Sequence, residues 1–165
     1  MTQNSPDAVD QILAQWNRER PDLDVSAMGP LGRLARLRTH LSREIDAVLS
    51  THGLNSSTFD VLATLRRSGA PFRLSPSELM ATMMVTSGTM TNRIDQLEKQ
   101  GLVERLPNPE DRRGLLVALT PKGLTLVDEA VTAHVANQER LMASLSVEER
   151  QALDILLRRH LTAFE

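Results

Sequence analysis

The stretch of sequence that decides the fold covers residues 74–123 and reads LSPSELMATMMVTSGTMTNRIDQLEKQGLVERLPNPEDRRGLLVALTPKG. It opens with Ser75-Pro76-Ser77-Glu78, in which Ser at the N-cap, Pro at the first helical position and Glu at the third form a capping box. This box predicts a short helix that ends at about Thr82. A second helix is expected from Thr86 to Gln100, because Gly101 is a suitable terminator in the left-handed backbone conformation.

A charged hairpin is predicted after the second helix. Residues 102–106 and 115–119 have the sequence of short strands, and residues 107–114 between them are crowded with Pro, Asn, Asp and Arg. A capped helix, a short turn, a second helix and a charged hairpin, in this order, are typical of a winged helix-turn-helix. We therefore expect a DNA-binding fold that is mainly α-helical, with a small β-hairpin as its wing.

The second helix of this motif has one apolar face and one polar face. Met90, Ile94 and Leu97 recur at helical spacing and are expected to face the core. The polar face carries short side chains, which let a helix backbone approach the DNA major groove and offer donors and acceptors to bases and phosphates. An ordinary solvated helix face is the alternative. The sequence predicts contacts with double-stranded DNA at Ser87, Thr89, Thr91, Asn92 and Gln96.

The tip of the predicted wing carries Asp111-Arg112-Arg113. Guanidinium groups at a hairpin tip can enter a narrow minor groove, whose negative potential attracts arginine. An exposed turn of mixed charge is the alternative. The charge distribution mildly favours DNA, because residues 66–113 hold eight Lys and Arg against six Asp and Glu, although the whole chain has a net charge of −2.

Helical patterns flank this motif on both sides. Ser5 and Pro6 predict a helix start, with Ser5 as the N-cap and Pro6 as the first helical residue. Apolar residues then repeat at helical spacing through the rest of the N-terminal and C-terminal parts of the chain. We expect a single domain over residues 1–165, composed of an added N-terminal helix (5–20), dimerisation helices (28–54 and 120–165) and the winged helix-turn-helix (55–119).

The composition excludes several other classes of protein. The chain has no cysteine, which rules out disulfides, thiolate zinc sites and cysteine nucleophiles. Its four histidines have no metal-ligand spacing, and the sequence contains neither a Gly-x-Ser-x-Gly elbow nor a glycine-rich phosphate loop. We expect no enzyme activity, no metal and no cofactor. The sequence has no secretory or membrane-spanning apolar run, so a cytoplasmic location without membrane association is expected.

The quoted stretch, from the capped helix through the wing to the final LTPKG, resembles the MarR (multiple antibiotic resistance regulator) family. The resemblance implies a homodimer joined by the N- and C-terminal helices, with one recognition helix per subunit in successive major grooves of a pseudo-palindromic operator. Such half-sites lie about 34 Å apart. Most such proteins are repressors that small anionic or phenolic ligands release. In the family's Asp-x-Arg wing pattern, Asp111 would brace the wing, Arg113 would reach the minor groove and Arg112 would contact a phosphate.

The expected N-terminal helix is similar to the one that distinguishes the urate-responsive subgroup of this family. The subgroup's effector site, carried over by resemblance, corresponds to Trp16, Asp60, Arg93 and Arg105. An arginine can pair with an anionic heterocycle, and an indole supplies an N–H and a flat surface. There are structural alternatives, in which Trp16 packs in the core and the Asp and Arg form a structural pair. Another alternative is a phenolic or aromatic carboxylate as the effector. An architectural DNA-binding protein without effector control is a further alternative, although such proteins are strongly basic.

Overall fold

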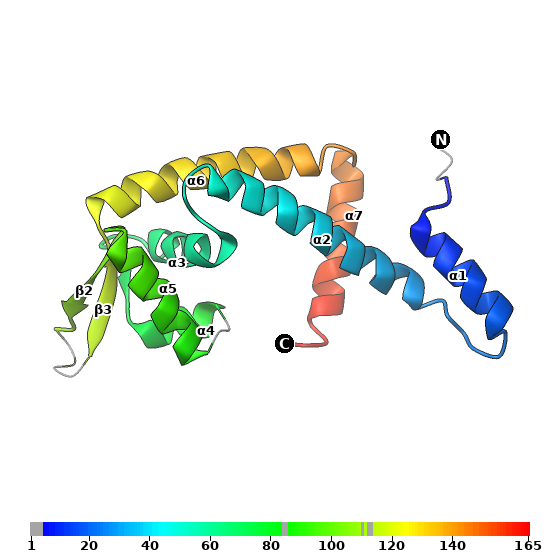
Figure 1. Cartoon of the computed structure of the whole chain (residues 1–165), viewed down its shortest axis with the longest axis horizontal. Helices are drawn as coiled ribbons and strands as arrows, with labels where there is room; N and C mark the ends of the chain where they lie inside the picture. Colours follow the sequence, from blue (N-terminus) through cyan, green and yellow to red (C-terminus); the bar gives the residue numbers. More distant parts are fainter. Residues whose placement is uncertain (1–4, 84–85, 110, 112–113) are drawn as a thin grey trace. The chain divides into compact units, whose positions relative to one another are not determined.

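The computed structural model describes residues 5–83, 86–109, 111 and 114–165 (Figure 1). The chain forms two compact units, unit 1 up to Glu44 and unit 2 over Ile45–Glu165. The helix α2 (Met28–Ser50) contributes its first part to unit 1 and its last residues to unit 2. The single-domain organisation expected from the sequence stays a prediction.

Unit 1 consists of α1 (Ala8–Glu19) and the first part of α2. Asp7 is the N-cap of α1, because its Oδ1 accepts hydrogen bonds from the backbone N–H of Val9 at 2.7 Å and of Asp10 at 3.0 Å. The Asp10 carboxylate accepts one in return from the Asp7 N–H, at 2.9 Å. The prediction that Ser5 caps this helix is therefore wrong. The N-cap is Asp7, two residues later, because the reciprocal hydrogen bonds between Asp7 and Asp10 satisfy the first free N–H groups of the helix.

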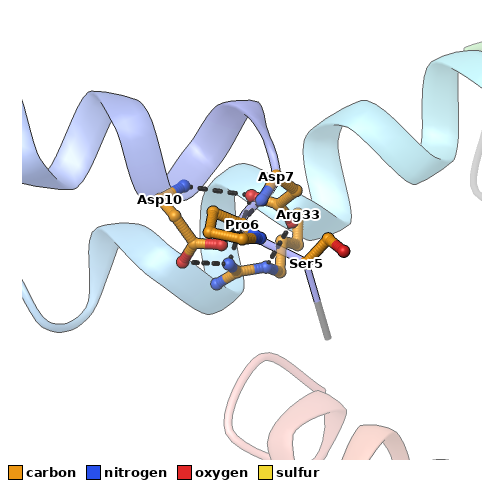
Figure 2. Close-up of a pocket in the computed structure, with 5 residues that line it drawn as sticks. All are labelled: Ser5, Pro6, Asp7, Asp10 and Arg33. Carbon is orange, nitrogen blue, oxygen red and sulfur yellow. Dashed lines mark hydrogen bonds and ion pairs between the residues drawn. The ribbon is translucent and has the colours of Figure 1, made fainter. Parts of the chain in front are cut away.

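Arg33 of α2 binds both aspartates of this capping box (Figure 2). Its Nε lies 2.8 Å from Asp7 Oδ2, and its Nη2 lies 2.6 Å from Asp10 Oδ1. Beside this ion pair Val9 packs against Gly32, where an added Cβ would lie 3.3 Å from Val9 Cγ1. The backbone N–H of Asp10, and then the Arg33 guanidinium, hold the pKa of Asp7 below its usual value. These contacts dock α1 onto α2 within unit 1.

Unit 2 contains the remaining helices and a small sheet, which confirms the expected fold class. Ser75 forms the predicted capping box with Glu78. Ser146 forms a second one with Glu149, and Thr120 caps the helix that follows it. In the described part of the chain no helix is both long enough and apolar enough to span a membrane. The elements are α3 (Ser56–Arg67), β1 (Arg73–Leu74), α4 (Pro76–Met83), α5 (Ser87–Lys99), β2 (Val103–Pro107), β3 (Leu115–Leu119), α6 (Pro121–Leu141) and α7 (Val147–Leu161).

The sheet is antiparallel and has the strand order β1-β3-β2. The strands β2 and β3 are labelled in Figure 1. The strands β2 and β3 are the predicted hairpin, with Val103 opposite Leu119 and Pro107 opposite Leu115. The strand β1 was not expected, since two residues are too short to show the alternation that identifies a strand. Its pairing places β3 in the centre of the sheet, where Val117 is completely buried.

The core of unit 2 fixes the orientation of α5 and joins the sheet to the helices. Met90, Ile94 and Leu97 are buried, as the sequence pattern predicts. Gly123, in the first turn of α6, lies so close to the chain entering β2 that an added Cβ would be 1.9 Å from the carbonyl oxygen of Leu102. This contact explains why the residue that follows Thr-Pro-Lys in this position is glycine.

Replacing Gly123 with alanine should destabilise unit 2 by about 3 kcal/mol or more, because the new methyl group overlaps a backbone oxygen. Urea denaturation followed by circular dichroism measures the change. Gly88→Ala is the matched control, since nothing lies within 4 Å of a Cβ at this position in α5. Its stability should be unchanged or up to about 1 kcal/mol higher, because alanine favours a helix. Equal stability of Gly123→Ala and the wild type would contradict the close contact.

Candidate functional site

The exposed face of α5 consists of small and polar side chains. It lies opposite the buried stripe formed by Met90, Ile94 and Leu97. The Thr91 hydroxyl donates a hydrogen bond to the Ser87 carbonyl oxygen at 3.0 Å, so its oxygen can still accept one from a ligand. A helix with such a face can approach another polar surface closely. The exposed residues of α5 are Ser87, Gly88, Thr89, Thr91, Asn92, Gln96, Glu98 and Lys99.

The turn between β2 and β3 is closed by backbone hydrogen bonds. The Asn108 N–H donates to the Gly114 carbonyl oxygen at 3.0 Å, and the Gly114 N–H donates to the Asp111 carbonyl oxygen at 2.9 Å. A Cβ at Gly114 would lie 3.1 Å from Asp111 Oδ2, so the aspartate side chain folds back over the turn. The predicted DNA contacts Arg112 and Arg113 lie outside the described residues. The bracing role expected of Asp111 stays a prediction.

Arg105 connects the wing to α5. Its guanidinium, on β2, forms ion pairs with Asp95 and Glu98, both on α5. The side chain is only 27% exposed, and the hydrogen bond to Asp95 is the main cause that raises the pKa of Arg105 above its usual value. The family resemblance predicted that Arg105 contacts an effector. Here Arg105 binds Asp95 instead, and its effector contact stays a prediction.

A cleft of about 330 Å³ lies among α3, α4 and α6. Asp60 stands on its α3 wall and is exposed, although surrounding protein atoms displace part of the water from its carboxylate. This desolvation raises the pKa of Asp60, and the positive charge of Arg93, followed by those of Arg67 and His134, offsets part of the rise. The cleft is lined by Phe59, Asp60, Ala63, Thr64, Arg67, Thr82, Met83 and His134.

The four residues expected to bind an effector fall into three places. Asp60 and the half-buried Arg93 interact electrostatically within unit 2. Arg105 is held by the carboxylates of α5. Trp16 belongs to α1 of unit 1 and is 41% exposed, so it is not simply a core side chain within that unit.

Two residues near Asp60 were missed by the sequence analysis. Arg67 follows Asp60 by seven residues, which is two helical turns, so this spacing could have placed it on the same face of α3. His134 lies on α6, far away in the sequence, and belongs to no motif. Only the packing of α6 against α3, where the rings of Phe59 and His134 lie 5.0 Å apart, brings it to the cleft.

Comparison with known proteins assigns this arrangement to a family. The family model described as MarR family matches residues 54–115, which cover the chain from just before α3 to the first residue of β3. The HTH-type transcriptional regulator PecS of Dickeya dadantii is 41% identical over 92% of this chain and 91% of its own length. The chain belongs to the MarR family.

Solved structures of MarR proteins support the same assignment. A mutant of MarR from E. coli, complexed with operator DNA, superposes with a TM-score of 0.73 at 31% identity, covering 84% of this chain and 99% of that one. Bordetella bronchiseptica BpsR, whose DNA binding is regulated by 6-hydroxynicotinic acid, gives a TM-score of 0.69 at 27% identity, covering 78% and 90%. The MarR-family protein described here is thus a DNA-binding transcriptional regulator with a winged helix-turn-helix, and not an enzyme.

Replacing Asp60 with asparagine should stabilise this MarR protein at neutral pH. The folded-state pKa of Asp60 lies above its unfolded value of 3.8, so ionisation costs the folded state free energy once the pH exceeds that folded-state pKa. The variant lacks this cost, so its advantage over the wild type should shrink as the pH falls through the folded-state pKa and disappear below 3.8. Chemical denaturation at a series of pH values measures the difference.

Glu78→Gln is the control of opposite sign. The backbone N–H and the hydroxyl of Ser75 lower the pKa of Glu78 below 4.5, so its carboxylate contributes stability at neutral pH that is lost as the pH falls through the folded-state pKa. This variant should therefore be less stable than the wild type at pH 7, and the difference should vanish in acid. If Asp60→Asn behaved in the same way as Glu78→Gln, the assigned desolvation of Asp60 would be wrong.

Proposed function

We propose that this regulator binds a pseudo-palindromic operator as a homodimer and acts as a repressor, released by urate or a similar anionic heterocycle. The observation that carries the proposal is the small polar face of α5, exposed opposite its buried stripe and tied to the wing by Arg105. The structural relative MarR, at 31% identity, is bound to operator DNA and supports this assignment.

DNA contacts follow from the dimensions and chemistry of the two grooves. The major groove admits one helix, and the short side chains of α5 bring its backbone near the base edges. Asn92 has both a donor and an acceptor on its amide, which is the pattern that reads adenine. The wing arginines are assigned to the minor groove and an adjacent phosphate. The proposed contacts are Ser87, Thr89, Thr91, Asn92 and Gln96 on α5, and Arg112 and Arg113 on the wing.

A second copy of the chain is the proposed partner of the terminal helices. Among its described residues α7 buries no side chain, although it carries an apolar stripe. Ile155 is 63% exposed and Phe164, just beyond the helix, is 76% exposed. Solvated apolar surface costs about 25 cal/mol per Å² relative to buried surface, so an interface between two such stripes is favourable. In unit 1, α2 likewise exposes Leu31 and Leu37.

The effector is proposed to act through the charges around Asp60. Arg93 stands on the recognition helix α5 and interacts with Asp60 on α3. An anion that competes for Arg93 changes the contacts that orient α5, and a ligand shifts a conformational equilibrium only through such differential contacts. BpsR, regulated by 6-hydroxynicotinic acid, supports an aromatic anion as the ligand class. Trp16 and Arg105 complete the proposed set, carried over by family resemblance.

Two alternatives make different demands on the chain. A phenolic or aromatic carboxylate could use the same arginines without requiring a ring N–H. An architectural DNA-binding protein without effector control would need a strongly basic surface, whereas the net charge here is −2. The acidic balance therefore favours a sequence-specific regulator over an architectural protein.

Asn92→Ala and Arg113→Ala should each weaken operator binding by about tenfold or more without lowering stability, because one bidentate or minor-groove contact is worth about 1–3 kcal/mol. Fluorescence anisotropy with labelled operator DNA at fixed salt measures the affinities. Glu129→Ala, on the exposed side of α6, is the control and should bind as the wild type does. Wild-type affinity in both variants would remove α5 and the wing from the mechanism.

Titration of urate, salicylate and 6-hydroxynicotinate into the preformed protein–DNA complex tests the effector. Urate should release the DNA at the lowest concentration, and Arg93→Ala or Trp16→Phe should require more of it, because each removes one proposed contact. The Glu129→Ala variant serves as the control here too. A full response to urate in both the Arg93 and Trp16 variants would reject the transferred site, and no release by any compound would favour the architectural alternative.

A further inference from the structure

The recognition helix α5 ends in a tight terminator. Gly101 has a φ of +70°, and its N–H donates to the Glu98 carbonyl oxygen at 2.9 Å. The Leu102 N–H donates to the Leu97 carbonyl oxygen at 3.0 Å. A helix leaves its last four carbonyl groups without partners inside the helix, and this terminator satisfies those of Leu97 and Glu98. The carbonyl groups that come next in the chain are left for other elements.

Three successive carbonyl groups at this end of α5 bind the beginning of α6 (Figure 1). The ammonium group of Lys122 donates a hydrogen bond to the Gln100 carbonyl oxygen at 2.8 Å. The Thr120 hydroxyl donates to the Gly101 carbonyl oxygen at 2.8 Å, and the Thr120 backbone N–H donates to the Leu102 carbonyl oxygen at 3.1 Å. We call these contacts of Thr120 and Lys122 the α6 clamp.

The α6 clamp is continuous with the helix cap of α6. The Thr120 hydroxyl oxygen accepts a hydrogen bond from the Gly123 N–H at 3.0 Å, while its hydrogen goes to the Gly101 carbonyl oxygen. Lys122 places a positive charge at the C-terminal end of α5, where the helix dipole is negative. Gly123 leaves no free space in the junction, because its Cα packs against the Leu102 carbonyl group. The first turn of α6 therefore cannot shift without breaking contacts with the end of α5.

These hydrogen bonds do something that the core packing of α5 does not. Burial of an apolar stripe keeps the helix on the core, but apolar contacts are not directional. Hydrogen bonds weaken steeply when distance and angle change, so the α6 clamp restricts how the end of α5 is oriented. From this junction α6 runs as one helix from Pro121 to Leu141 and leads to α7, which carries the exposed apolar stripe assigned above to the partner copy.

We propose that Thr120 and Lys122 are positioning residues for DNA recognition, which hold α5 at one orientation to α6 and so set the separation of the two recognition helices in the dimer. This inference rests on the proposed binding of a two-half-site operator by a homodimer. Neither residue needs to touch DNA, since both act through α5. A dimer with an intact α6 clamp accepts one spacing of half-sites, and a dimer with a loosened clamp tolerates others.

Fluorescence anisotropy with a small panel of DNA duplexes tests the proposal. The tightest duplex selected from a randomised library serves as the operator, and two further duplexes carry one base pair more or one fewer between its half-sites. One base pair displaces a half-site by about 3.4 Å and rotates it by about 35°. The wild type should bind each altered duplex about tenfold or more weakly than the operator, because one recognition helix no longer meets its bases.

Lys122→Met and Thr120→Val should reduce this spacing penalty. Each removes one side-chain donor of the α6 clamp, and one hydrogen bond changes an equilibrium by about threefold to tenfold, so the penalty should fall by about threefold or more. Lys122→Arg and Thr120→Ser keep a donor and should retain the wild-type penalty. Thr120→Val also weakens the cap of α6, so circular dichroism checks its folding. If it does not fold, the two Lys122 variants decide.

Salt dependence separates positioning from a direct phosphate contact by Lys122. Loss of one phosphate contact reduces the slope of log affinity against log salt concentration by about 1. Lys122→Met should keep the wild-type slope, because its effect passes through α5. A slope reduced by about 1 in this variant would assign Lys122 to the DNA backbone and overturn the positioning role.

The wild type shows whether the proposed function fails or only this inference does. If the wild type discriminates among the three duplexes and the folded Lys122→Met and Thr120→Val variants discriminate equally well, the α6 clamp has no positioning role and the proposed function stands. If the wild type binds all three duplexes with the same affinity, binding to two half-sites is contradicted, and this inference fails with it.

Discussion

The burial of one stripe of α5 is the constraint on which the site depends. Met90, Ile94 and Leu97 occupy the core of unit 2, so the short polar residues on the other side of the helix must face outward. The chain beyond α5 is fixed as tightly, because the Thr120 hydroxyl donates to the Gly101 carbonyl oxygen at 2.8 Å and Gly123 packs on Leu102. Recognition helix and sheet are therefore positioned by the same core.

Electrostatic contacts then connect α5 to two neighbouring regions, the wing and the cleft at Asp60. Arg105 joins β2 to α5 through Asp95 and Glu98, so the wing and the recognition helix are linked as one DNA-binding surface. Arg93, also on α5, interacts electrostatically with Asp60, which lines the cleft. Under the proposed function, an anion that competes for Arg93 and the operator both depend on α5, so binding of one is coupled to binding of the other.

The local features of the fold could be predicted from the sequence, and the long-range ones could not. The local sequence is sufficient to predict the capping boxes at Ser75 and Ser146 and the helix stop at Gly101, because these features depend only on neighbouring residues. The start of α1 was predicted two residues early, because Ser5-Pro6 and Asp7 are both good starts and only the reciprocal bonds with Asp10 decide between them.

Site residues follow the same division. The exposed face of α5 follows from helical spacing, whereas the Arg105 ion pairs depend on how the hairpin packs on α5. His134 reaches the cleft only through the packing of α6 on α3, which no spacing in the sequence indicates.

The central claim is that the exposed face of α5 enters the major groove of the operator. A structure of the protein bound to its operator tests this most directly. The account predicts that Asn92 and Gln96 lie within hydrogen-bonding distance of base edges or phosphates, with β2 and β3 directed toward the adjacent minor groove. A complex in which these residues face solvent while another surface contacts the DNA would contradict it.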